Sequence, residues 1–106
     1  NKYSKFSAVK SRKAAVSAPS KVSCKMSNGG TEVSWTKVAG ASGYVIYRNG
    51  SAVKTVKSSV LTWKDTKAYD SQTGMYWVYN YYVKAFKTVN GKRIYSKPTK
   101  TINLYS

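Results

Sequence analysis

The chain has 106 residues and a formal net charge of +16, from 19 Lys and Arg against 3 Asp and Glu. This length suits a single domain, and no apolar run is long enough to cross a membrane as a helix. With no histidine, the commonest general base is missing, and three scattered carboxylates cannot build a calcium cage. We therefore expect a protein that is not an enzyme and that needs no metal or cofactor.

Residues 1–17 are rich in Lys, Ser and Ala and have no clear hydrophobic period. We expect a flexible basic linker, or the tail of a preceding unit, because such a composition buries too little apolar surface to fold. The chain begins at Asn1 and shows no signal peptide, so we expect a piece of a longer protein. Pro19 then opens the predicted domain, which spans residues 18–106.

Strands are predicted where apolar residues alternate between turn signals. Asn49-Gly50 and Asn90-Gly91 are the dipeptide favoured in tight type I′ hairpins. Asn28-Gly29-Gly30 is another turn signal, and no stretch has the period of a helix of useful length. The seven predicted strands are residues 20–26, 31–37, 44–48, 52–56, 60–65, 76–87 and 93–104.

Alternation along these strands predicts which side chains point into the core. Seven short strands with regularly spaced turns are the expected pattern of a β-sandwich. Tyr79 lies near the start of a predicted strand, in the position of the tyrosine corner of β-sandwiches. We expect its hydroxyl to form a hydrogen bond with nearby backbone. Cys24 is the only cysteine, so it is expected to act as a small apolar side chain. The predicted core is Val22, Cys24, Val33, Trp35, Tyr44, Ile46, Leu61, Trp63, Tyr79, Tyr81, Val83, Ala85, Ile102 and Leu104.

Four short patterns occur in a fixed order along residues 18–104: Val33-x-Trp35, Tyr44-x-Ile46, Trp63-x-Asp65 and Tyr79-x-Tyr81-x-Val83-x-Ala85. Their order and spacing resemble a fibronectin type III domain. The stretches at 43–48 (GYVIYR) and 90–96 (NGKRIYS) are similar to such modules in secreted and surface proteins of Gram-positive bacteria. The connection between residues 65 and 79 is longer than in the family pattern.

This resemblance implies an all-β fold, a seven-stranded immunoglobulin-like antiparallel β-sandwich. It also implies an extracellular or cell-surface location, and it places Asp65 at the end of a strand with no catalytic role. We expect a monomer.

The chain carries ten tyrosines and three tryptophans, more than the predicted core needs. On the outer side of adjacent strands, Tyr47 should lie near Tyr82 or Phe86, and Tyr76 and Trp77 occupy the long connection. Surface rings can stack on sugars or anchor a protein partner, so these five are the candidate ligand-binding residues. The structural alternatives are cross-strand aromatic pairing for the first group and a self-packed loop for the second.

The positive charge forms a second signal, since such a field attracts polyanions of many kinds. Nucleic acid, acidic polysaccharide, teichoic acid and anionic lipid all qualify, and binding through the field alone should be non-specific and salt-dependent. The alternative is a lysine-rich surface that serves solubility.

Three functions remain open. The first is a spacer or adhesion unit in a larger secreted or cell-surface bacterial protein, whose partners are neighbouring domains of the same polypeptide. The second is a carbohydrate-binding module, in which exposed aromatics contact cell-wall or plant polysaccharide. The third is nucleic-acid binding, but sixteen Lys against three Arg suit bidentate base reading poorly, so we expect no specific nucleic-acid partner.

Overall fold

The computed structural model describes residues 16–105, so the predicted linker at 1–17 lies almost wholly outside the described residues. The all-β prediction is confirmed, because the described elements are nine strands and one short 3-10 helix, η1 (Thr66–Ala68). In that part of the chain no helix is long and apolar enough to span a bilayer. The strands are β1 (Val22–Ser27), β2 (Gly30–Trp35), β3 (Gly43–Arg48), β4 (Ser51–Lys57), β5 (Thr62–Asp65), β6 (Tyr69–Asp70), β7 (Met75–Tyr76), β8 (Tyr81–Val89) and β9 (Lys92–Tyr95).

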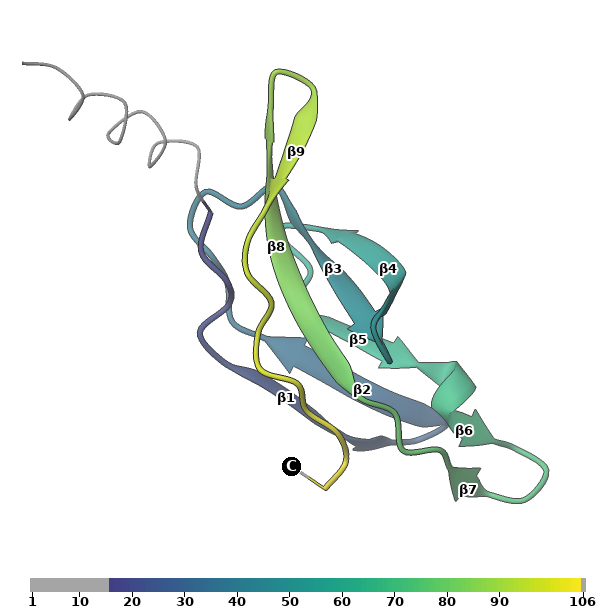
Figure 1. Cartoon of the computed structure of the whole chain (residues 1–106). Helices are drawn as coiled ribbons and strands as arrows, with labels where there is room; N and C mark the ends of the chain where they lie inside the picture. The colour runs from purple at the N-terminus through teal and green to yellow at the C-terminus, as the bar shows by residue number, and fades with distance from the viewer. Residues whose placement is uncertain (1–15, 106) are drawn as a thin grey trace, which may run out of the picture.

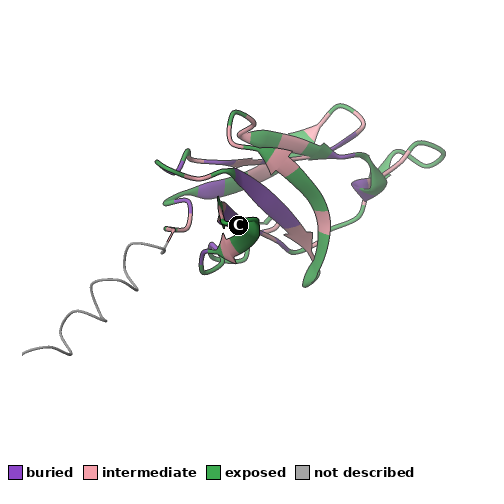
Figure 2. Ribbon diagram, turned by 90° about the horizontal axis from the view of Figure 1, so that it is seen from above, coloured by how far each residue is buried: buried purple, intermediate pink, exposed green. Residues whose placement is uncertain are grey.

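The strands form two main antiparallel sheets and a short ribbon (Figure 1). One sheet has the order β1-β2-β5 and the other the order β4-β3-β8-β9, while β6 and β7 pair with each other. Buried side chains of β2, β3 and β8 share one core, as in a sandwich of two sheets. Figure 2 shows the buried residues concentrated along the strands, whereas the hairpin tips are exposed.

Most of the predicted core is confirmed. Tyr44, Ile46, Tyr81 and Val83 are fully buried, and Trp35 packs at 5.7 Å from the Tyr44 ring at a tilt of 55°. Five predicted core residues lie at its margin and are only half-buried. Cys24 and Trp63 belong to the edge strands β1 and β5, and Leu61, Tyr79 and Leu104 lie outside the strands.

Both hairpins predicted from Asn-Gly are confirmed. Asn49 and Gly50 join β3 to β4 with φ values of 51° and 86°, and Asn90 and Gly91 join β8 to β9 with 53° and 78°. Two successive positive φ values define the type I′ turn, which matches the twist of the flanking strands. Opposite the end of β3, Val53 is an extra residue in β4, because the register shifts between Ile46 and Tyr47.

The last predicted strand is much shorter than expected. β9 ends at Tyr95, and beyond it only one isolated bridge joins Ile102 to Tyr81. Along the intervening segment, Ser96 and Thr99 pair with β8 through both backbone and side chain. Their N–H groups donate to the Ala85 and Val83 carbonyls, while the Ala85 N–H donates to Ser96 Oγ at 2.9 Å and the Val83 N–H donates to Thr99 Oγ1 at 3.0 Å. These bonds keep the donors of β8 satisfied where Pro98 interrupts a regular ladder.

The tyrosine-corner prediction for Tyr79 is wrong in the described part of the chain, where the Tyr79 hydroxyl bonds to no backbone group. Its ring instead packs edge-on to Tyr81, with centroids 6.5 Å apart, and lies 5.3 Å from Cζ of Arg48. The tyrosine that binds nearby backbone is Tyr44, whose hydroxyl oxygen accepts the Val38 N–H at 2.9 Å.

Candidate functional site

The first group of candidate residues lies on the outer face of the four-stranded sheet. The register of β3 and β8 places Tyr47 opposite Tyr82 and Val45 opposite Lys84. The two tyrosine rings are nearly parallel, at 11°, with centroids 4.7 Å apart, which confirms the predicted contact between Tyr47 and Tyr82. Lys84 Nζ lies 5.2 Å from the Tyr47 centroid.

This geometry is that of an offset stack rather than of a flat platform. Each ring covers a face of the other, and both side chains are half-buried. A sugar would need rings whose faces are open in a common plane, but Tyr47 and Tyr82 turn their faces toward each other. The pair therefore resembles the cross-strand aromatic contacts that stabilise a sheet without a ligand.

The expected exposure of Phe86 is wrong: this residue is only 6% exposed. Gly43 lies opposite Phe86 and has no side chain, so the ring folds over it, and a Cβ on Gly43 would lie 2.7 Å from Phe86 Cζ. Tyr95 packs against the ring at 5.9 Å, and Arg93 Cζ lies 4.4 Å from its centroid. Alternation correctly assigns Phe86 to the outer face, but it does not reveal these covering neighbours.

The second group occupies the β6–β7 ribbon. Tyr76 pairs with Tyr69 across the ribbon, with ring centroids 4.9 Å apart, and its hydroxyl donates to the Ser27 carbonyl at 2.7 Å. Tyr76 is therefore an anchor that fastens the ribbon to the end of β1. The self-packed loop considered for this connection agrees with these contacts.

Trp77 differs from Tyr76, because 53% of its surface is exposed. Its backbone N–H donates to the Ala68 carbonyl at 2.7 Å, so its position is fixed although its ring is free. Met75 and Val78 beside it are exposed as well, at 63% and 41%. Of the five candidate residues, Trp77 alone presents a largely open aromatic surface.

A buried polar cluster joins the two sheets, and sequence reasoning did not find it. Asp65, at the end of β5, is 1% exposed, and both its carboxylate oxygens lie 2.9 Å from Nη1 of Arg48 in β3. The Tyr81 hydroxyl of β8 donates to Asp65 Oδ2 at 2.7 Å, and the Lys67 N–H donates to Oδ1 at 3.1 Å. Burial, followed by the hydrogen bond to Asp65, raises the pKa of Tyr81 above its ordinary value.

A signal for this cluster is present in the sequence. Asp65 follows Trp63 at a strand end, and Arg48 closes a strand that is otherwise apolar or aromatic. Charges in such positions are buried only when they are paired. Both carboxylate oxygens of Asp65 have hydrogen-bond partners within the protein, so the cluster acts as a structural link between the two sheets, which we call the latch.

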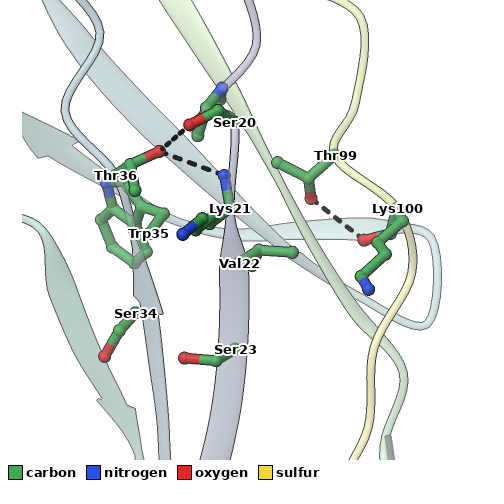
Figure 3. Close-up of a pocket in the computed structure, with 10 residues that line it drawn as sticks. Ser20, Lys21, Val22, Ser23, Ser34, Trp35, Thr36, Thr99 and Lys100 are labelled. Carbon is green, nitrogen blue, oxygen red and sulfur yellow. Dashed lines mark hydrogen bonds between the residues drawn. The ribbon is translucent and has the colours of Figure 1, made fainter.

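A groove of about 640 Å³ lies beside the start of β1 (Figure 3). It was not predicted, because its walls come from segments far apart in the sequence. Two of its lining residues are cationic and none is acidic. The groove is lined by Pro19, Ser20, Lys21, Val22, Ser23, Ser34, Trp35, Thr36, Thr99 and Lys100.

Over residues 16–105, no group of three His, Cys, Asp or Glu side chains could hold a metal ion. Cys24 is a free, half-buried thiol, and burial raises its pKa. In comparison with known proteins, no family model matches the chain and no curated protein matches it.

Proposed function

We propose that the chain is a non-catalytic accessory module of the fibronectin type III kind, a spacer or adhesion unit in a larger secreted or cell-surface bacterial protein. The division into a β1-β2-β5 sheet and a β4-β3-β8-β9 sheet supports this proposal, since a three-plus-four sandwich is what the resemblance implies. The two Asn-Gly hairpins agree with it as well.

The observation that carries the spacer role is the path of the chain. The described residues begin near the base of the β8–β9 hairpin and end at the opposite end of the molecule, near the start of β8 (Figure 1). A module that the chain enters at one end and leaves at the other holds its neighbours apart. Domains arranged in this way can be strung in series along a polypeptide.

The aromatic residues support the same role, because most of them already have packing partners. Tyr47 stacks on Tyr82, Phe86 is covered by Tyr95, and Tyr76 bonds to the backbone at Ser27. The aromatic surplus thus stabilises the outer sheet face and the ribbon.

A second candidate function, carbohydrate binding, rests on Trp77 alone. This ring is exposed and its backbone is fixed, and those are the properties of a residue that stacks on a sugar. In this alternative, Trp77 would be the primary contact and Tyr47 would contribute little, because its ring is already stacked.

Affinity electrophoresis on neutral cell-wall and plant polysaccharides separates the two functions. The spacer role predicts that wild type, Trp77→Ala and Tyr47→Ala all migrate as they do in gels without polysaccharide. Retardation of the wild type by a neutral glycan that Trp77→Ala abolishes would replace the spacer role with carbohydrate binding. Thermal unfolding of each variant verifies that a change in mobility does not reflect unfolding.

A further inference from the structure

We propose that the groove beside β1 is a binding site for a linear polymer that carries both hydroxyl groups and regularly placed anionic groups, such as an acidic polysaccharide or a polyol phosphate. This inference rests on the groove and goes beyond the role of spacer or adhesion unit. It assigns part of the positive charge of the protein to a defined binding site.

The groove concentrates cations without any acidic neighbour. Lys21 lies just before β1, and Lys100 lies on the C-terminal segment on the other side of the groove; both are exposed (Figure 3). Glu32 pairs with Lys25 at 3.5 Å and Asp65 pairs with Arg48 at 2.9 Å, so neither carboxylate neutralises the groove. A concave surface lined by one sign of charge raises the local concentration of oppositely charged ligands.

The walls between the two lysines carry hydroxyl groups. Thr36 Oγ1 contacts Ser20 Oγ and accepts the Lys21 N–H, both at 3.1 Å, which fixes this wall (Figure 3). On the other wall, Thr99 Oγ1 accepts the Val83 N–H at 3.0 Å and donates to the Lys100 carbonyl at 3.1 Å, which fixes this wall as well. The remaining hydroxyls are those of Ser23 and Ser34, which lie directly opposite each other in β1 and β2.

This chemistry favours a hydroxyl-bearing polyanion over other ligands. An ammonium group acts as a point charge, so Lys21 and Lys100 can donate to either carboxylate or phosphate oxygens without the planar geometry that Arg imposes. The hydroxyl of Ser23, which is exposed, can both donate and accept, and this matches the hydroxyl groups of a sugar or polyol. Trp35, the one aromatic residue of the lining, is only 5% exposed, so the groove lacks the open rings on which nucleic-acid bases stack.

The size of the groove agrees with such a ligand. A volume of about 640 Å³ lies within the range of about 300–1,000 Å³ that is typical of ligand sites. The groove runs between the exposed edge strand β1 and the segment that contains Thr99. We expect it to hold a few units of a longer chain.

Two double variants with the same charge test the site. Lys21→Ala/Lys100→Ala removes both cations of the groove, and Lys54→Ala/Lys57→Ala removes two exposed cations of edge strand β4, which lies in the other sheet. Each variant has a net charge of 16 − 2 = +14. Binding of polygalacturonate and of poly(glycerol phosphate) is measured by calorimetry at about 50 and about 200 mM salt, a range over which screening changes strongly.

The groove predicts a loss of about tenfold in affinity for Lys21→Ala/Lys100→Ala at low salt, since two ion contacts of exposed, solvent-screened lysines are removed. The β4 variant should lose less than about threefold, through the weakened field alone. Ser23→Ala, which leaves the charge intact, should weaken binding by about two- to threefold, the effect of a single neutral hydrogen bond. Binding of only one of the two polymers would identify the anionic group that the site accepts.

Equal losses in the two double variants would overturn the proposal, because binding would then follow net charge alone. Failure of the wild type to bind either polymer would overturn it too. If polyglutamate or single-stranded DNA bound as tightly as polygalacturonate or poly(glycerol phosphate) at the same concentration of charge, the hydroxyl groups of the ligand would contribute nothing to binding. The test of the spacer role uses neutral glycans and substitutes Trp77 and Tyr47, whereas this test uses anionic polymers and substitutes Lys21 and Lys100. The two results are therefore independent.

Discussion

The hydroxyl of Tyr81 in β8 donates a 2.7 Å hydrogen bond to Oδ2 of Asp65, which belongs to the opposite sheet. Arg48 of β3 lies 2.9 Å from the same oxygen. One buried carboxylate thus joins three strands of two sheets. Because Asp65 and Tyr81 are almost completely buried, removal of one partner leaves a polar group that water cannot easily satisfy.

Removal of the carboxylate should destabilise the fold severely. Asp65→Ala leaves the Arg48 guanidinium without its counter-charge and the Tyr81 hydroxyl without an acceptor, so we expect a loss of about 3–5 kcal/mol in unfolding free energy. Urea denaturation followed by tryptophan fluorescence measures it. Glu32→Ala removes the same charge from a pair whose Lys25 partner is 75% exposed, so that variant should lose less than about 1 kcal/mol. Similar losses in both variants would contradict the latch.

Tyr81 should make stability depend on pH in the alkaline range. Burial, and next its bond to Asp65, raise the pKa of Tyr81 above the ordinary value of 10.0. The unfolded chain therefore releases this proton first as the pH rises above about 10, and the native state loses up to about 1.4 kcal/mol of stability per pH unit from this group. Below that pH the contribution is fully present.

The measurement compares wild type with Tyr81→Phe in urea at about pH 9 and about pH 11. At the lower pH, the wild type should be more stable by about 1.5–3 kcal/mol, the value of a hydrogen bond to a charged group. At the higher pH this advantage should shrink. The two proteins differ only at residue 81, so the comparison isolates the contribution of the Tyr81 hydroxyl. If the difference in unfolding free energy between wild type and Tyr81→Phe stayed the same at both pH values, the pKa of Tyr81 would not be raised in the folded protein.

Trp35 should tolerate phenylalanine far better than alanine. Its ring is 5% exposed and packs on Tyr44, so Trp35→Ala should cost about 3–5 kcal/mol. Its Nε1 is buried without a hydrogen-bond partner among the described residues, so Trp35→Phe removes no bond and relieves a desolvated donor. We expect Trp35→Phe to cost at least about 2 kcal/mol less than Trp35→Ala in chemical denaturation. Equal costs would show that the retained ring of Phe does not stabilise the core.

Gly43 should not accept a methyl group. A Cβ there would collide with the backbone carbonyl of Val56 and lie 2.7 Å from Phe86 Cζ. Gly43→Ala should therefore cost about 1–3 kcal/mol, the usual range for overpacking, as measured by thermal unfolding. Gly43→Ala/Phe86→Leu should recover little of that loss, because the clash with the backbone remains. Full recovery would place the strain in the ring alone.

Periodicity and turn chemistry predicted much of this fold. Alternation assigned Val33, Tyr44, Tyr81 and Val83 to the core, and both Asn-Gly turns came from dipeptides whose backbone preference is local. These features depend on neighbours close in sequence. For the same reason, the pairing of Tyr47 with Tyr82 followed once their strands were adjacent.

The features that were missed depend on contacts between distant segments. Phe86 is buried because Gly43, Tyr95 and Arg93 surround it, and no one-strand pattern contains that information. The same holds for the groove, whose lysines lie 79 residues apart at positions 21 and 100. The shortened final strand shows another limit. Hydroxyls of Ser96 and Thr99 accept the Ala85 and Val83 N–H groups, for which a pattern of apolar residues predicts backbone acceptors.

The extra residue in β4 should hinder the association of protein molecules through this edge of the sheet. β4 is the edge of its sheet, and an unpaired edge is a template on which strands of other molecules can add and start a fibre. The shift at Val53 breaks the even spacing of the edge, and Lys54 and Lys57 bring repulsive charge to it. We expect this edge to resist strand addition, so concentrated solutions should stay free of fibrils.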